Sequence, residues 1–179
     1  KIYCDQKINI ELEYKLLDDF FKKRILILFS ELGFRQDIIR ASLSNDGVDP
    51  YLVYERVSKL TNFKDSKDGK NFLKAFKRLD SLTEKMKNQN LQRNILVKKE
   101  ELDLYKLLNE IVEKIQMGKK DFIFHDLEML KRITKSLNQF FDNVTVNVSD
   151  EKTKQNRKIL INKFHSNVNS LYNFSSLEI

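Results

Sequence analysis

The sequence predicts an all-α protein, and three observations lead to this class. The 179 residues contain only 4 glycines and 1 proline, whereas sheet-rich domains normally use more of both in their tight turns. Apolar residues recur with the helical period of 3.6 along most of the chain. Residues that start or stop helices stand at the ends of these periodic segments. We therefore predict a bundle of about seven helices, with enough apolar side chains, 41% of the residues, for a folded core.

The first predicted helix begins near Glu11 and ends at Gly33, since glycine accepts the positive φ of a helix terminus at little cost. One row of apolar residues is expected to face inward from it: Leu12, Leu16, Phe20, Leu28 and Leu32. Leu17, Phe21 and Ile25 lie beside that row. A short helix over about 35–43 follows, with Ile39 and Leu43 inward.

The clearest helix start is Asp49-Pro50, an N-cap followed by proline at the first helical position. The helix after it carries an inward row at i, i+4 and i+7: Val53, Val57 and Leu60. The next helix is expected over about 66–86, and its core face is formed by Phe72, Phe76, Leu79, Leu82 and Met86. The polar segment 87–93 is the best linker candidate.

A second group of helices is predicted after this linker. One helix spans about 99–117 and ends at Gly118, and its apolar row comprises Leu104, Leu108, Ile111 and Ile115. Another spans about 120–141, with the row Leu127, Leu130, Ile133, Leu137 and Phe141. Both rows follow the helical period.

The segment around Val144, Val146 and Val148 alternates like a short strand. Because no partner strand is predicted elsewhere, we expect an extended connector with buried valines. Ser149 should then cap the last helix, whose buried row is Leu160, Phe164, Val168 and Leu171. We predict one domain over 1–179, with helical subgroups at about 11–86 and 99–174.

The charge balance points to a polyanionic partner, while the sequence carries no catalytic or metal-binding motif. Lys and Arg outnumber Asp and Glu by 33 to 26, which suits nucleic acid or a membrane surface, although a general bias toward Lys and Asn explains it equally well. His125 and His165 are isolated, and the single Cys4 excludes an internal disulfide and fits a reducing cytoplasm. We expect no active site, no metal and no cofactor in this chain. The longest apolar run, 25–29, is too short to span a bilayer, and the missing initiator Met suggests a piece of a longer protein.

The leading binding feature is the basic helix predicted over 66–86. Its cations fall on neighbouring positions of one face: Lys67, Lys70, Lys74, Lys77, Arg78 and Lys85. Such a face can neutralise several phosphates, and Lys22-Lys23-Arg24, Arg35 and Arg40 could extend it. Tyr51 and Tyr54 are candidates for stacking on unpaired bases. The alternative interpretation is a lysine-rich face that only keeps the helix soluble.

Four local patterns occur in an order and at a spacing that resemble one known family. They are Asp19-Phe20-Phe21-Lys22-Lys23-Arg24 with Gly33-Phe34 and Asp37-Ile38-Ile39-Arg40-Ala41-Ser42-Leu43; Asp49-Pro50 with Arg56-Val57; Phe76-Lys77-Arg78-Leu79; and Phe140-Phe141-Asp142-Asn143-Val144-Thr145-Val146-Asn147 with Asn156-Arg157 and Asn173-Phe174-Ser175-Ser176-Leu177. Together they resemble the C-terminal anticodon-binding domain of the bacterial glycyl-tRNA synthetase beta subunit, related to the domain of arginyl-tRNA synthetase. The chain departs from the family's Asn-Ile-Leu at Asp80-Ser81-Leu82, and from its Met at Asn147.

The resemblance implies a glycine–tRNA ligase of α₂β₂ form, in the cytoplasm, whose alpha subunit holds the aminoacylation site and uses ATP and Mg²⁺. This domain would bind the anticodon region of tRNA-Gly without chemistry of its own. On this basis we predict that phosphates are held by Lys74, Lys77, Arg78, Arg24 and Arg157, while Phe140 and Phe141 belong to the core. Two alternatives stay open: an arginyl-type anticodon-binding domain, and a helical protein-interaction module that binds no RNA.

Overall fold

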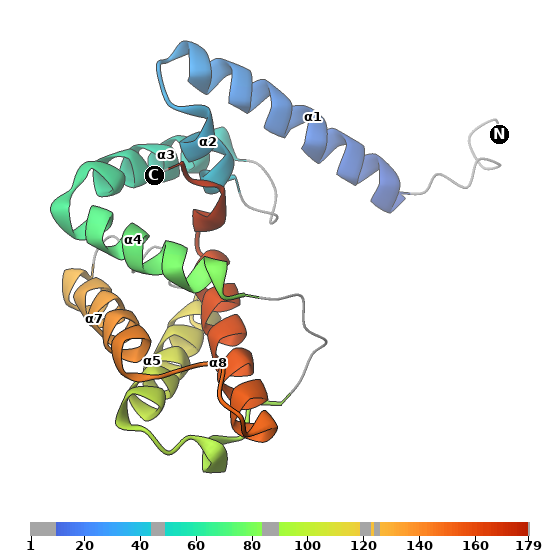
Figure 1. Ribbon diagram of the computed structural model, residues 1–179. Helices are drawn as coiled ribbons and strands as arrows, with labels where there is room; N and C mark the ends of the chain where they lie inside the picture. The colour runs from blue at the N-terminus through green and yellow to red at the C-terminus, as the bar shows by residue number, and fades with distance from the viewer. Residues whose placement is uncertain (1–9, 44–48, 84–89, 119–122, 124–125, 179) are drawn as a thin grey trace, which may run out of the picture.

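The computed structural model describes residues 10–43, 49–83, 90–118, 123 and 126–178. Within this part of the chain it contains seven α-helices, two short 3₁₀ helices and no strand (Figure 1). The predicted all-α class is therefore confirmed. The residues 44–48, the residues 84–89 at the predicted linker with Lys85 and Met86, and His125 lie outside the described residues.

Helix α1 (Ile10–Glu31) extends away from the other helices and meets them at its C-terminal end, where it contacts α2 (Gln36–Ser42) and where Phe29 packs against Tyr54 (Figure 1). It ends as predicted, because Gly33 adopts a φ of 91° and the amide of Phe34 donates to the Phe29 carbonyl at 3.1 Å. The predicted inward row is wrong. Ile25 and Phe29 are buried, whereas four members of the predicted row are exposed: Leu16, Phe20, Leu28 and Leu32.

Helices α3 (Pro50–Asp65) and α4 (Lys67–Ser81) form a tight hairpin around one residue, Ser66. Ser66 ends α3 and also caps α4, accepting the Gly69 amide at 2.9 Å. The predicted cap at Asp49 is confirmed, since its carboxylate accepts the amides of Tyr51 and Leu52. Helix α4 buries its predicted core row up to Leu79, but it ends at Ser81 and leaves Leu82 38% exposed.

Three further helices complete the bundle: α5 (Lys99–Gln116), α7 (Leu127–Asn143) and α8 (Glu151–Asn169). Two predicted starts are corrected. The helix α7 begins at Leu127 because Asp126 accepts the Met129 amide as its N-cap, and α8 is capped by Asp150 in place of Ser149, through the Thr153 amide. The connector between them bends at residues 146, 147 and 149. Val144 is buried as predicted, whereas Val146 and Val148 are only half-buried.

One hydrophobic core unites helices from both sides of the predicted linker. Helix α4 lies at its centre and packs against α3, α7 and α8. The 3₁₀ helix η1 (Arg93–Ile95) lies against α8, and η2 (Phe174–Ser176) inserts Phe174 beside Phe72 and Phe76. The position of α4 matters for function, because packing on several sides leaves a single face of this helix toward solvent.

Candidate nucleic-acid interface

The outward face of α4 carries cations and no carboxylate. At about 100° per residue, its five basic residues fall within a sector of roughly 100° around the helix axis. They are Lys67, Lys70, Lys74, Lys77 and Arg78. The two acids of α4, Asp68 and Asp80, lie outside that sector by the same count. From the first to the last cation the face is about 16 Å long, so it presents a row of positive charge on a rigid element. We call these five residues the α4 basic face.

Three members of the α4 basic face are free to take a ligand. Lys67, Lys70 and Lys74 are exposed, and none of these side chains makes a hydrogen bond or ion pair with the part of the chain that the structure describes. A lysine in this state keeps its three donors for an incoming anion. The predicted contact Lys74 is therefore accessible, and Lys70 joins it one turn earlier.

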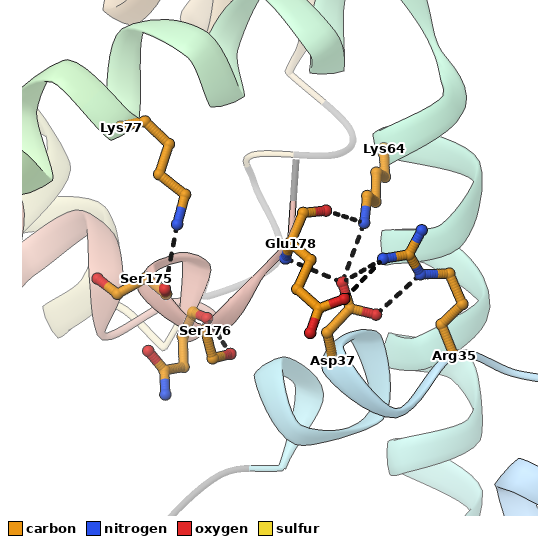
Figure 2. A network of polar contacts seen from close by, with 8 residues as sticks. Arg35, Asp37, Lys64, Lys77, Ser175, Ser176 and Glu178 are labelled. Atoms are coloured by element: carbon orange, nitrogen blue, oxygen red, sulfur yellow. Dashed lines mark hydrogen bonds and ion pairs between the residues drawn. The ribbon is translucent and has the colours of Figure 1, made fainter.

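The other two predicted contacts of α4 are partly engaged. Lys77 is half-buried, and its Nζ donates to the Ser175 carbonyl at 3.3 Å, which directs it toward η2 (Figure 2). Arg78 lies 3.4 Å from the Asp142 carboxylate, with its Cζ 4.9 Å above the Phe141 ring. Its side chain is still 50% exposed, so a phosphate could compete with Asp142 for it.

The structure places the remaining two predicted contacts away from the α4 basic face. Arg157 is only 7% exposed, and its guanidinium donates to the Glu101 carboxylate and to the Thr145 carbonyl. Because both donors point inward, we correct the prediction for Arg157 and assign it a structural role. Arg24 is exposed, but it lies on α1, among the apolar residues of that helix.

A groove of about 370 Å³ runs between α4 and α7, beside the α4 basic face. Its lining includes three amides, two cations and two carboxylates: Asn71, Asn138, Gln139, Lys131, Lys135, Asp68 and Asp142. Sequence reasoning missed this groove. A signal was present, because the polar positions of α7 recur at i, i+3, i+4, i+7 and i+8, which marks the outer face of a helix.

The two predicted stacking residues differ in accessibility. Tyr51 is 67% exposed, and its hydroxyl bonds to Glu55 at 3.1 Å. Tyr54 packs edge-on against Phe29 and Phe34, with ring centroids 6.0 and 5.8 Å apart. Tyr54 therefore helps to hold α1, whereas Tyr51 at the start of α3 presents a ring to solvent.

A cluster of charged groups ties the C-terminal segment to α2 and α3 and so positions η2. Figure 2 shows Arg35 and Lys64 directed at the carboxylate of Asp37, at 3.0 Å each, and the Glu178 amide donates to it at 3.0 Å. Burial disfavours the charged form of Asp37, but these hydrogen bonds outweigh it and lower its pKa to about 2. Arg35 is thereby occupied, so it does not extend the α4 basic face.

Asp80, His165 and Ser175 meet where α4, α8 and η2 join. The His165 Nε2 lies 2.8 Å from Asp80 Oδ1, and Ser175 Oγ donates to the same oxygen at 2.6 Å. Burial opposes the charge on Asp80, yet the hydrogen bonds from Ser175 and His165 lower its pKa. In a hydrolytic triad the imidazole stands between hydroxyl and carboxylate, each on its own ring nitrogen. Here Ser175 bonds Asp80 directly, so the three side chains do not have the arrangement of a triad. Their hydrogen bonds link α4, α8 and η2.

In the part of the chain that the structure describes, no group of three or more His, Cys, Asp or Glu side chains is placed to hold a metal ion. None of the helices in that part combines the length and apolarity that a membrane span requires.

The fold and its surface define an all-α domain that presents one cationic helix face. The residues 72–173 match the family model described as the DALR anticodon binding domain, over more than half of the chain. The chain belongs to this family. The matched segment includes Lys74, Lys77 and Arg78 but excludes Arg24.

Curated relatives extend the comparison beyond the matched segment. The chain is 30% identical over 185 residues to the glycine–tRNA ligase beta subunit of Sulfurihydrogenibium sp., covering 99% of this chain and 27% of that protein. It is 30% identical over 167 residues to the beta subunit of Syntrophomonas wolfei, covering 91% of this chain and 24% of the relative. The chain thus spans about a quarter of the length of these relatives, and the resemblance drawn from its motifs is confirmed.

Proposed function

We propose that this chain binds the anticodon region of a tRNA and holds its phosphates against the α4 basic face. One observation carries the proposal: five cations share the solvent side of α4, and both acids of the helix fall outside their sector. Cations grouped in this way release counterions when they neutralise phosphates, which makes the free energy of binding favourable and dependent on salt. The anticodon-binding family to which the chain belongs supports the choice of RNA as the polyanion.

The groove between α4 and α7 is the second part of the proposed interface. Phosphate contacts set the position of a nucleic acid, whereas contacts to base edges set specificity. The amides of Asn71, Asn138 and Gln139 line this groove next to the cations of α4. An amide both donates and accepts, so it can pair with the edge of an unstacked base. We assign base recognition to these amides and phosphate binding to Lys70, Lys74 and Arg78.

For the whole protein we propose the beta subunit of a glycine–tRNA ligase that acts on tRNA-Gly in the cytoplasm. The names of the relatives support this assignment over the arginyl alternative. An alpha subunit would be its partner, in an α₂β₂ tetramer, and would supply the aminoacylation site with ATP and Mg²⁺. In that complex the present chain would recognise the anticodon region of tRNA-Gly.

The test compares two double variants that lose the same charge. Lys70→Ala with Lys74→Ala removes two cations of the α4 basic face that have no protein partner in the described structure. The control, Lys106→Ala with Lys152→Ala, removes two exposed cations on α5 and α8. Dissociation constants for tRNA-Gly are measured over a series of salt concentrations.

We expect the Lys70 and Lys74 variant to bind tRNA-Gly roughly fivefold more weakly. The negative slope of log K against log salt should become less steep by about 1.4, at about 0.7 for each lost phosphate contact. The control should match the parent chain. Equal losses in both variants would mean that only net charge matters. Equal affinity for tRNA-Gly, tRNA-Gly with a changed anticodon and random RNA would contradict anticodon recognition, and a preference for tRNA-Arg would favour the arginyl alternative.

A further inference from the structure

Helix α1 exposes an apolar face. Seven of its large apolar side chains, together with Leu32 directly after it, are between 47% and 69% exposed, and these eight are more than half of all such residues in the described part of the chain. They are Tyr14, Leu16, Leu17, Phe20, Phe21, Ile27, Leu28 and Leu32. Exposed apolar side chains that stand singly are normal on protein surfaces, whereas a contiguous group marks a contact surface.

The structure itself offers little to hold most of α1 in place. Its buried side chains from residue 14 onward are Ile25 and Phe29, near the end that meets α2. The preceding turns extend away from the other helices (Figure 1). Most helical stability in proteins comes from packing of an apolar face against other elements. A helix of 22 residues with this composition therefore requires a second surface to pack on.

The apolar residues of α1 form two adjacent rows with one cation between them. Leu17, Phe21 and Leu28 are spaced at i, i+4 and i+11, and Leu16, Phe20 and Ile27 repeat the same spacing one position earlier. At about 100° per residue, Arg24 falls between the two rows, and Glu31 falls between them two turns later. A surface that covers this face must therefore be apolar and must also offer a carboxylate or carbonyl oxygen to the guanidinium of Arg24.

We propose that the α1 apolar face packs against another segment of the same polypeptide, in a protein of the length of the relatives. Roughly three quarters of those relatives lies outside the part that this chain matches, so sufficient chain exists to cover it. A covalently attached segment meets α1 at a high effective concentration without a second molecule. The inference does not depend on RNA binding.

A second copy of the chain fits this face less well. The exposed apolar side chains run from Tyr14 to Leu32, and Arg24 lies near the middle of that span. Two α1 helices paired through this face, whether parallel or antiparallel about its centre, would bring the two Arg24 guanidinium groups together. Like charges brought into an apolar contact oppose association.

The test uses the full-length polypeptide that contains this sequence and measures hydrogen exchange at several protein concentrations. We expect the amides of residues 14–32 to exchange at least tenfold more slowly than unprotected peptides, at every concentration and without another subunit. The triple variant Leu17→Gln, Phe21→Gln and Leu28→Gln should lose that protection. The control Lys15→Gln with Asp19→Asn, on the polar side of α1 by helical spacing, should keep it. Unchanged exchange in α4, α5 and α8 shows that each variant is folded.

A crosslinking measurement decides the partner without requiring any variant to lose packing. A photo-reactive phenylalanine analogue in place of Leu28 should form a crosslink within one chain, to a peptide outside the 179 residues. Crosslinks that double the mass would show a second copy, and crosslinks to another subunit would show an intermolecular partner. Either result overturns the proposal, as does exchange of α1 amides at the rate of unprotected peptides.

Discussion

The guanidinium of Arg157 and the carboxylate of Glu101 form an ion pair inside the molecule, although 56 residues separate them in sequence. Their side chains are 8% and 1% exposed. The second carboxylate oxygen of Glu101 accepts the amides of Val97 and Lys98, at 2.8 and 2.9 Å, and Arg157 also donates to the Thr145 carbonyl at 2.8 Å. The pair therefore joins the start of α5, the connector after α7, and α8.

Replacing Arg157 by Met should reduce the free energy of unfolding by about 3 kcal/mol, because the buried carboxylate of Glu101 would lose its counter-charge. The double variant Glu101→Leu with Arg157→Met should recover part of that loss, since it removes both buried charges. Urea unfolding followed by circular dichroism gives the free energies. A loss below about 1 kcal/mol in the single variant would show that water reaches the site and that the pair is not a structural link.

The sequence contained a signal for this ion pair that periodicity alone does not use. Arg157 precedes Leu160, Phe164 and Val168 at i, i+3, i+7 and i+11, and all four side chains are buried. Glu101 stands in the same relation to Leu104 and Leu108 of α5. Opposite charges on two buried rows indicate a buried pair, because neither charge is stable there alone. The prediction that Arg157 binds phosphate rested on its charge and ignored its position in the buried row of α8.

The burial of α4 could be predicted from sequence because this helix has one narrow apolar row. Helix α1 is different, since apolar residues occupy most of its circumference. A helical period identifies apolar rows but not the surface that each row meets. The row chosen for burial therefore faces solvent in this structure, while Ile25 and Phe29 face α2. The α4–α7 groove depends on how two helices are placed relative to each other. The spacing of apolar residues within each helix does not specify that placement.

Acid should destabilise the chain in part through Asp37. Its pKa is lowered from the ordinary 3.8 to about 2 by the partners Arg35, Lys64 and the Glu178 amide. A lowered pKa means that the folded state favours the carboxylate, so the contribution is complete above pH 5 and is lost as the pH falls toward 2. It amounts to about 2 kcal/mol, of which about half remains at pH 3.

The variant Asp37→Asn isolates this effect from the other acids with lowered pKa values, such as Asp80 and Asp126. It should unfold about 2 kcal/mol more easily than the parent chain at pH 7, and the two should converge near pH 2. Urea unfolding at pH 7, 3 and 2 measures both. Parallel stability curves across this range would show that Asp37 is not the group responsible.

Replacing Gly69 by Ala should destabilise the α3–α4 hairpin, although alanine normally favours a helix by about 1 kcal/mol. A Cβ at position 69 would lie 1.8 Å from the Phe63 carbonyl oxygen, which is backbone and cannot turn aside. We expect a net loss of about 2 kcal/mol, or a fall in Tm of about 4–8 °C. An unchanged or higher Tm would show that the two helices separate freely.

The variant Gly118→Ala is the control for this prediction. Gly118 has a φ of 74° but nothing within 4 Å of an added Cβ. Its substitution should cost only the backbone strain of a left-handed residue, about 1 kcal/mol. The comparison separates steric overlap at Gly69 from backbone strain at a helix end.

Replacing Asp142 by Asn should strengthen RNA binding, in the direction opposite to most substitutions at an interface. The carboxylate of Asp142 lies 3.4 Å from Arg78 and also lines the α4–α7 groove. A phosphate that binds Arg78 must displace this carboxylate, and the two negative charges repel each other. An exposed ion pair of this kind is worth about 0.2–1 kcal/mol, so its removal should raise the affinity for tRNA-Gly by a factor of about 1.4 to 5.

The matched control for Asp142→Asn is Glu113→Gln, which removes the same charge from an exposed position on α5. If only net charge mattered, both variants would bind more tightly by the same factor. If Arg78 holds a phosphate, Asp142→Asn alone gains appreciably, and adding Arg78→Ala abolishes the gain. Dissociation constants at two salt concentrations decide between these outcomes. A gain that persists without Arg78 would place the repulsion of Asp142 elsewhere in the groove and remove Arg78 from the proposed contacts.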